Sequence, residues 1–122
     1  AQLQSWISAL YAGRYEEVAE GLARWGDDPV ALFYRGELEL LRDNAGEAIA
    51  PLRKFLDYDT PERLRWYRYL AMLRLAEAYS RTGQRKQAEK TLSQAIDYHS
   101  DRDLMRHVTK ARRRWFEKEP SG

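Results

Sequence analysis

Cysteine is absent from the 122 residues, which excludes a disulfide framework and any metal site built on thiolates. Because both cytosolic and exported proteins can lack cysteine, the compartment stays unknown. The longest apolar runs are only a few residues, far short of the roughly 20 that a membrane-spanning helix needs. The first residues include neither a basic segment nor an apolar stretch, so we expect no signal peptide. The missing initiator Met suggests a segment processed or cut from a longer chain.

The usual catalytic constellations are missing as well. The chain has two His, no Gly-rich phosphate loop and no nucleophile placed beside a base. We therefore predict a protein that is not an enzyme and that needs no cofactor. His99, Asp103 and His107 are four residues apart, a spacing that can hold a metal on one helix face. Ser100 suits a helix cap, however, which assigns His99 to the preceding turn, and we expect no metal site.

Charge of both signs is plentiful and nearly balanced. Lys and Arg number 21 against 19 Asp and Glu, a net charge of +2 that disfavours nucleic acid as a partner. Residues 101–122 hold an excess of basic side chains. The candidate basic patch there comprises Lys110, Arg112, Arg113 and Arg114. It would suit RNA, an anionic lipid surface or an acidic protein, whereas the alternative is a solvated outer helix face.

Pro and Gly are few, and they stand at the borders of segments in which apolar residues recur every three or four positions. That period is typical of amphipathic helices, so the sequence predicts an all-α protein, with one domain over residues 1–122. The predicted helices cover about 2–12, 15–25, 29–42, 45–57, 61–81, 84–97 and 101–117. Asp28 and Thr60 each precede a Pro and are predicted caps, and Asn44 with Glu47 three residues later forms a predicted capping box.

Three stretches of the chain repeat one another at offsets of 30 and 40 residues. The aligned sets are Val18, Ala48 and Ala88; Leu22, Leu52 and Leu92; Trp25, Phe55 and Ala95; and Gly13, Asp43 and Gly83. We expect the first set to let two helices of a pair approach closely. The next two sets would fill the space between neighbouring pairs, and Gly would supply a positive φ in the turn. Neither helix of a pair can bury its apolar stripe alone, so the pairs must stack.

These residues resemble the tetratricopeptide repeat family over about residues 1–100. The third copy carries the likeness in Leu75, Ala76, Tyr79, Gly83, Ala88, Leu92 and Ala95, and the first in "AGRYEEVAEGLARWGDDP". In the middle copy Gly36 fits, but Glu39 stands where the family usually has Tyr and Asp43 replaces the turn Gly, which leaves the register of its first helix open. The resemblance implies a right-handed superhelical stack of three helix–turn–helix repeats, about 1–28, 29–59 and 61–99, with a capping helix at about 101–117.

The resemblance also implies a non-enzymatic protein–protein interaction module, an adaptor or scaffold that holds a protein or peptide partner in a concave groove. The candidate groove residues are Phe33, Glu37, Leu40, Trp66, Leu70, Leu73, Arg74, Glu77 and Arg81. The alternative is that Trp66 and Leu70 pack on a neighbouring helix and touch no partner. Trp66, Tyr67 and Tyr69 point in different directions around one helix, so at least one of them must be exposed.

One subclass of the family grips a C-terminal carboxylate with two Lys, two Asn and one Arg. Arg74 matches the Arg, but Leu3, Ile7 and Leu70 stand where Lys, Asn and Lys are needed. We therefore reject that mode of binding. Two other interpretations stay open: a homo-oligomer formed through an end pair, and a regulatory or scaffold segment of a larger protein.

Overall fold

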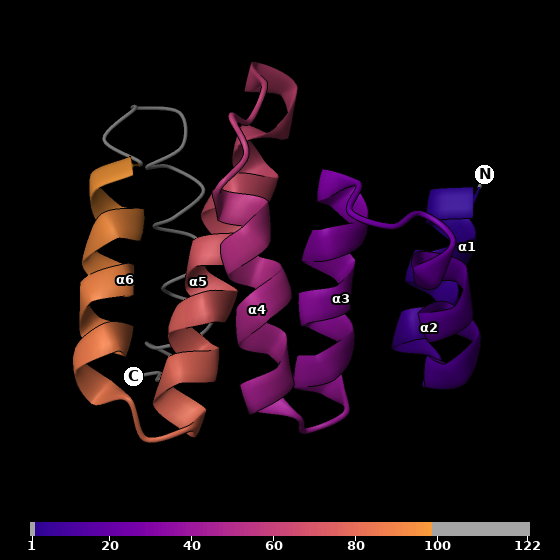
Figure 1. Ribbon diagram of the computed structural model, residues 1–122, viewed down its shortest axis with the longest axis horizontal. Coiled ribbons are helices and arrows are strands. Elements are labelled where there is room, and N and C mark those ends of the chain that lie inside the picture. The colour runs from indigo at the N-terminus through magenta and orange to yellow at the C-terminus, as the bar shows by residue number, and fades with distance from the viewer. Residues whose placement is uncertain (1, 99–122) are drawn as a thin grey trace, which may run out of the picture.

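The computed structural model describes residues 2–98, and these residues contain helices and turns but no strand (Figure 1). The helices are α1 (Gln2–Tyr11), α2 (Tyr15–Ala23), α3 (Pro29–Leu41), α4 (Ala45–Leu56), the 3-10 turn η1 (Glu62–Leu64), α5 (Arg65–Arg81) and α6 (Arg85–Tyr98). Successive helices pack on one another and form a row from α1 and α2 to α6 (Figure 1). The predicted all-α fold is confirmed for this part of the chain. The predicted last helix, 101–117, lies outside the described residues.

The start of α3 follows the predicted capping signal. Asp28 accepts the backbone N–H of Val30 on Oδ1 at 3.0 Å, and Pro29 occupies the first turn of the helix. This satisfies one of the backbone donors that a helix start leaves without an intrahelical partner. At Asn44 the predicted side-chain cap is wrong, because the amide Nδ2 turns back to donate to Oε1 of Glu39 at 3.1 Å.

The start of α5 also differs from the prediction. The α-helix begins at Arg65, after the single 3-10 turn, and not at Pro61. The Thr60 hydroxyl is engaged elsewhere, since it donates to the carbonyl of Tyr58 at 3.4 Å and accepts from Arg68 at 3.2 Å. Thr60 therefore links the α4–α5 connection to the first turn of α5 by hydrogen bonds, and it does not cap the helix.

The three tight turns, α1–α2, α3–α4 and α5–α6, share one backbone geometry. Each places one residue at positive φ: Gly13 at 83°, Asp43 at 65° and Gly83 at 80°. In each turn the next residue donates its N–H to a carbonyl five residues earlier, at 2.9, 2.7 and 2.8 Å in chain order. The carbonyl of Glu39 thus accepts the same hydrogen bond in the middle turn that the carbonyl of Tyr79 accepts in the last turn. The middle copy is in the same register as the others, because Asp tolerates the left-handed conformation better than most residues.

Close approach within the pairs depends on small residues. Val18 and Ala48 are fully buried, and Ala88 packs on the main core, in line with the prediction. A Cβ atom added to Gly36 would overlap the side chain of Leu52, and one added to Gly21 would overlap the ring of Trp6. The sequence pattern did not single out Gly21, although it brings α2 against α1 in the same way.

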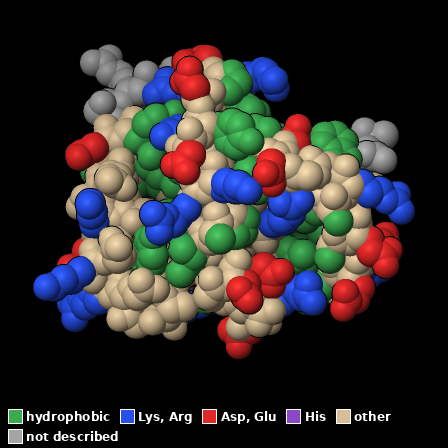
Figure 2. All heavy atoms as spheres, viewed as in Figure 1, with side chains coloured by type: hydrophobic (Ala, Val, Ile, Leu, Met, Phe, Trp, Pro, Cys, Tyr) green, Lys and Arg blue, Asp and Glu red, His purple; other side chains and the backbone are tan. Residues whose placement is uncertain are grey.

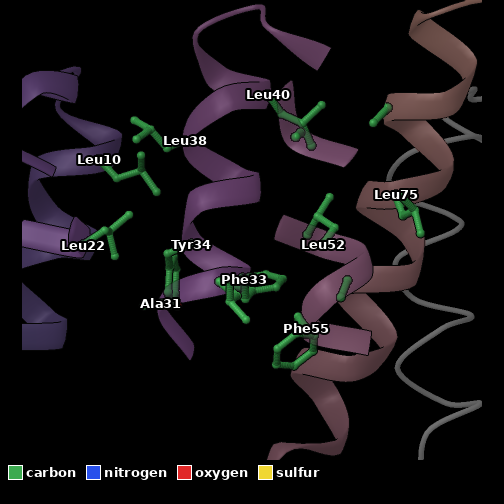
Figure 3. Packing of buried hydrophobic residues seen from close by; sticks show 14 of the residues in the cluster. Leu10, Leu22, Ala31, Phe33, Tyr34, Leu38, Leu40, Leu52, Phe55 and Leu75 are labelled. Atoms are coloured by element: carbon green, nitrogen blue, oxygen red, sulfur yellow. The ribbon is translucent and has the colours of Figure 1, made fainter. Parts of the chain in front are cut away.

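A continuous apolar core runs along the row of helices. Figure 3 shows Leu10 and Leu22 on one side of α3, and Phe33, Leu52 and Phe55 on the other. A second cluster joins α5 to α6 through Tyr69, Met72 and Ala95.

The Leu positions of the repeat were expected to fill the space between neighbouring pairs. That expectation holds for Leu22 and Leu52, which are buried, and is wrong for Leu92, which is 42 % exposed. Within residues 2–98, α6 is the last helix. In the same described part, no helix combines the length and the apolar character that a bilayer crossing requires.

Candidate functional site

Side chains from α1, α3 and α5, the first helices of the three pairs, meet around a hollow of about 260 Å³. We call it the inner hollow. Its lining residues are Tyr11, Glu37, Leu40, Leu41, Arg74, Glu77 and Arg81. All of these except Tyr11 and Leu41 belong to the set of groove residues predicted from the sequence. The inner hollow is therefore the place where the structure brings most of that set together.

Glu37 is the centre of the inner hollow, with a side chain only 8 % exposed. Its Oε1 accepts from Nε of Arg74 at 2.6 Å, and its Oε2 accepts from the hydroxyl of Tyr11 at 3.2 Å. A buried carboxylate needs such partners, because water no longer solvates its charge. Burial, and then the Glu37 carboxylate, raise the pKa of the Tyr11 hydroxyl above its ordinary value. Glu37 of α3 is thus hydrogen-bonded to both α1 and α5.

A second ion pair forms the other side of the inner hollow. Arg81 meets Oε2 of Glu77 at 2.6 Å and donates to the backbone carbonyl of Leu40 at 3.2 Å. The carbonyl lies in the last turn of α3, where it also accepts the backbone N–H of Asp43 at 3.1 Å. All four charged residues of the inner hollow are consequently paired inside the chain, Glu37 with Arg74 and Glu77 with Arg81.

The inner hollow has two exposed apolar residues, and sequence reasoning missed both of them. Tyr11 is 62 % exposed and Leu41 is 43 % exposed, and both line the hollow. A four-residue step was the available signal, since Tyr11 follows Ile7 and Leu41 follows Glu37 by one helical turn. The four-residue step identifies one face of a helix. Whether that face lines a hollow depends on where the neighbouring helices lie.

Phe33 is a wrong prediction as a groove residue. It is 2 % exposed and packs edge-to-face against Tyr34, Tyr67 and Phe55, with ring centroids 5.0, 5.1 and 6.1 Å away. The side of α3 that carries Phe33 faces the core between α4 and α5. The predicted stripe on α3 was therefore set partly on the core-facing side of the helix.

The remaining predicted groove residues lie on α5, outside the inner hollow. Trp66 is 39 % exposed and lies against the ring of Tyr69, with centroids 5.4 Å apart. The prediction that one aromatic of this cluster is exposed is confirmed by Trp66. Leu70 packs against the main core, and Leu73 packs against the second cluster. Leu70 therefore packs on neighbouring helices, as the alternative interpretation expected, whereas Trp66 lies on the surface.

A wider hollow of about 560 Å³ lies between α5 and α6, and we call it the end hollow. Its lining residues are Leu73, Arg74, Ala76, Glu77, Ser80, Arg81, Arg85, Ala88, Glu89 and Leu92. Arg74, Glu77 and Arg81 line both hollows, so they form a charged ridge between them. We call these three residues the α5 ridge.

Charges of both signs line the two hollows, since Arg74 and Arg81 lie there together with Glu77. On the face that Figure 2 shows, Lys and Arg alternate with Asp and Glu, and hydrophobic surface lies between them. Within residues 2–98, no group of three His, Asp or Glu side chains is placed to hold a metal ion. The candidate basic patch, Lys110 and Arg112 to Arg114, lies outside the described residues.

Residues 70–102 match the family model of the tetratricopeptide repeat. The match supports assignment to the tetratricopeptide repeat family. The matched segment includes most of α5, the turn at Gly83 and all of α6. No curated protein and no solved structure matches the chain. Tetratricopeptide repeats are typically non-enzymatic interaction modules, so the assignment suggests protein partners for this chain.

Proposed function

We propose that this chain is a tetratricopeptide repeat adaptor or scaffold that binds a protein or peptide partner on the surface formed by α1, α3 and α5. In this proposal the three helix pairs form a right-handed superhelical stack, with these helices on its concave side. One observation carries the proposal: side chains from three successive pairs converge on the inner hollow. A surface used only for solvation would not need a buried carboxylate that joins all three.

The network around Glu37 supports binding by a surface that is formed in advance. Tyr11 and Arg74 are held by the same carboxylate before any partner arrives. Fewer side chains then lose freedom on association, which lowers the cost of binding. Aromatic and Arg side chains are also the residue types in which interface energy most often concentrates.

The test compares two matched surface variants as bait for proteins from the native host. Leu41→Ser removes apolar surface from the inner hollow, and Lys90→Ala changes an exposed residue of α6 that lines neither hollow. We expect at least one protein to be retained by the unmodified chain and by Lys90→Ala, and lost with Leu41→Ser. If every retained protein binds all three baits equally, the inner surface is not the binding site.

Light scattering over a range of concentrations addresses the homo-oligomer alternative. The adaptor proposal expects a mass that does not change with concentration. A mass that grows with concentration for the unmodified chain and stays monomeric for Leu41→Ser would mean that the inner surface serves self-association instead.

A further inference from the structure

We propose that the partner presents an extended segment with two apolar side chains, one for the inner hollow and one for the end hollow, on either side of the α5 ridge. This inference rests on the proposed function and adds the chemistry of the partner. It differs from recognition of a charged terminus, because the side chains that would supply charge are already paired within the chain.

The pairing of charges argues against an acidic or basic anchor. A charged group entering the inner hollow would compete with the contact between Glu37 and Arg74, at 2.6 Å, or with that between Glu77 and Arg81, also at 2.6 Å. The side chain of Glu37 is only 8 % exposed, so separating it from Arg74 would leave an uncompensated buried charge, which is strongly unfavourable. The Glu77–Arg81 pair is more exposed, and separating it would cost less. A neutral apolar group can enter without breaking either pair. Affinity should therefore come from apolar burial and depend little on salt.

Each hollow offers apolar surface that remains exposed. In the inner hollow, the hydroxyl of Tyr11 is engaged by Glu37, so the ring and the neighbouring Leu41 are what a partner would meet. In the end hollow, Leu73 and Leu92 lie on opposite helices. Covering these side chains removes apolar area from water, which is the general driving force for association.

The size of the inner hollow favours a side chain over a small molecule. Its volume of about 260 Å³ lies below the usual range for small-molecule sites, which begins at about 300 Å³. The end hollow, at about 560 Å³, has room for a large side chain together with part of its backbone. Neither hollow encloses its contents, which suits a segment that crosses both.

The α5 ridge fixes the spacing of the two anchors. The hollows lie on two sides of one helix, and a helix with its side chains is about 10 Å across. A polyproline-type extended chain rises about 3.1 Å per residue and returns to the same side every three residues. Two apolar residues three positions apart would therefore reach both hollows. A helical segment would need anchors about seven positions apart, at about 1.5 Å per residue.

The ridge itself favours the extended form. Glu77 and Arg81 have more acceptor and donor positions than one ion pair uses, since a guanidinium carries five N–H groups. The backbone N–H and C=O groups of an extended segment can bond to such side chains, whereas a helix has already satisfied its own. Polar or small residues are expected at the two positions between the anchors.

A random peptide library displayed on phage, selected on the immobilised chain, tests the inference. We expect the selected peptides to share two apolar residues three positions apart, without a preference for net charge or for a free C-terminus. The strongest peptide is then synthesised, and its Kd is measured by fluorescence anisotropy at low and at physiological salt. We expect less than about a twofold change in Kd between the two conditions.

Matched variants assign the two anchors to the two hollows. Leu41→Ser and Leu92→Ser should each raise the Kd of the synthetic peptide by about tenfold, equivalent to about 1.4 kcal/mol. Lys90→Ala, which lies outside both hollows, should change the Kd by less than about twofold. All three positions are exposed, and far-UV circular dichroism checks that each variant is folded.

The outcomes separate this inference from the proposed function. Peptides that lose binding with Leu41→Ser, yet are acidic and strongly salt-dependent, overturn the apolar anchors and leave the proposed function standing. Binding that Leu92→Ser does not weaken overturns the second anchor, and anchors seven positions apart overturn the extended form. Peptides that bind both Leu variants normally, or a library without any binder, count against the inference and the proposed function together.

Discussion

At the scale of single residues, the side chains of the inner hollow have two kinds of role, structural and binding, and that of Glu37 is structural. It lies at the junction of α1, α3 and α5 and holds two partners on its two oxygens. Because it contacts other parts of the chain and little solvent, its main role is to hold the wall of the inner hollow in place. Leu41 and Tyr11, by contrast, contribute surface that is open to a partner.

Glu37→Ala is expected to lower the free energy of unfolding by about 3 kcal/mol, because the Arg74 guanidinium loses its buried partner. Urea denaturation measures the change. The double variant Glu37→Leu with Arg74→Met removes both charges and should recover much of the loss. If the single substitution costs less than about 0.5 kcal/mol, the pair has no structural role of the kind described here.

Gly36→Ala is expected to destabilise the chain by about 1–3 kcal/mol, since the new methyl group would overlap Leu52 across the α3–α4 contact. Gly46→Ala is the matched control, because its Cβ would lie 3.9 Å from Thr82 Cγ2, an ordinary contact, and Ala favours a helix. Thermal denaturation of both variants compares them. Equal effects at the two positions would contradict the close approach at Gly36.

At the scale of elements, the turn is the most regular feature of the chain. The three turns share their geometry although one carries Asp43 where the others carry Gly. The residue spacing predicted this correspondence, because a turn of this kind is a local structure set by one residue with positive φ. The helix faces were harder to predict. On α3, buried residues occur all round the helix, as Leu32, Phe33, Tyr34 and Leu38 show, so periodicity alone marks no single outer side.

Asp43→Gly is expected to stabilise the chain by about 1 kcal/mol, because Gly adopts the left-handed conformation without the penalty that a Cβ brings. Gly83→Ala should destabilise it by a similar amount for the same reason. The loss of the long, exposed contact of Asp43 with Arg81, at 3.9 Å, should matter little. A stabilising Gly83→Ala substitution would be inconsistent with the shared turn geometry.

Tyr34 of α3 and Tyr67 of α5 share a hydrogen bond between their hydroxyls, and we expect the free energy of unfolding to fall at alkaline pH because of Tyr34. Burial, and then the hydrogen bond with Tyr67, raise the pKa of Tyr34 well above its ordinary value. The unfolded chain loses this proton near pH 10, while the folded chain keeps it to higher pH. The contribution of Tyr34 is therefore fully present below about pH 10 and declines as the pH rises further. Denaturant titrations above pH 10 should show a shallower decline for Tyr34→Phe, and an unchanged slope would contradict the assignment.

At the scale of the whole molecule, the packing of the helices in a row brings side chains from separate helices together on one surface. The sequence was sufficient to predict the helix pairs and most of the inner-hollow residues, because those residues repeat along first helices at regular steps. It was not sufficient to reveal Tyr11, Leu41 or the exposure of Leu92. Those depend on which helices meet in space, and no local pattern encodes that.

The position of a bound partner is the property on which the whole account depends. Hydrogen–deuterium exchange of the chain, alone and with the protein retained in the bait comparison, measures it directly. The account predicts slower exchange at the C-terminal ends of α1 and α3 and along α5 from Arg74 to Arg81, the segments that line the inner hollow. Protection confined to α2 and α4, with α1, α3 and α5 unchanged, would contradict it.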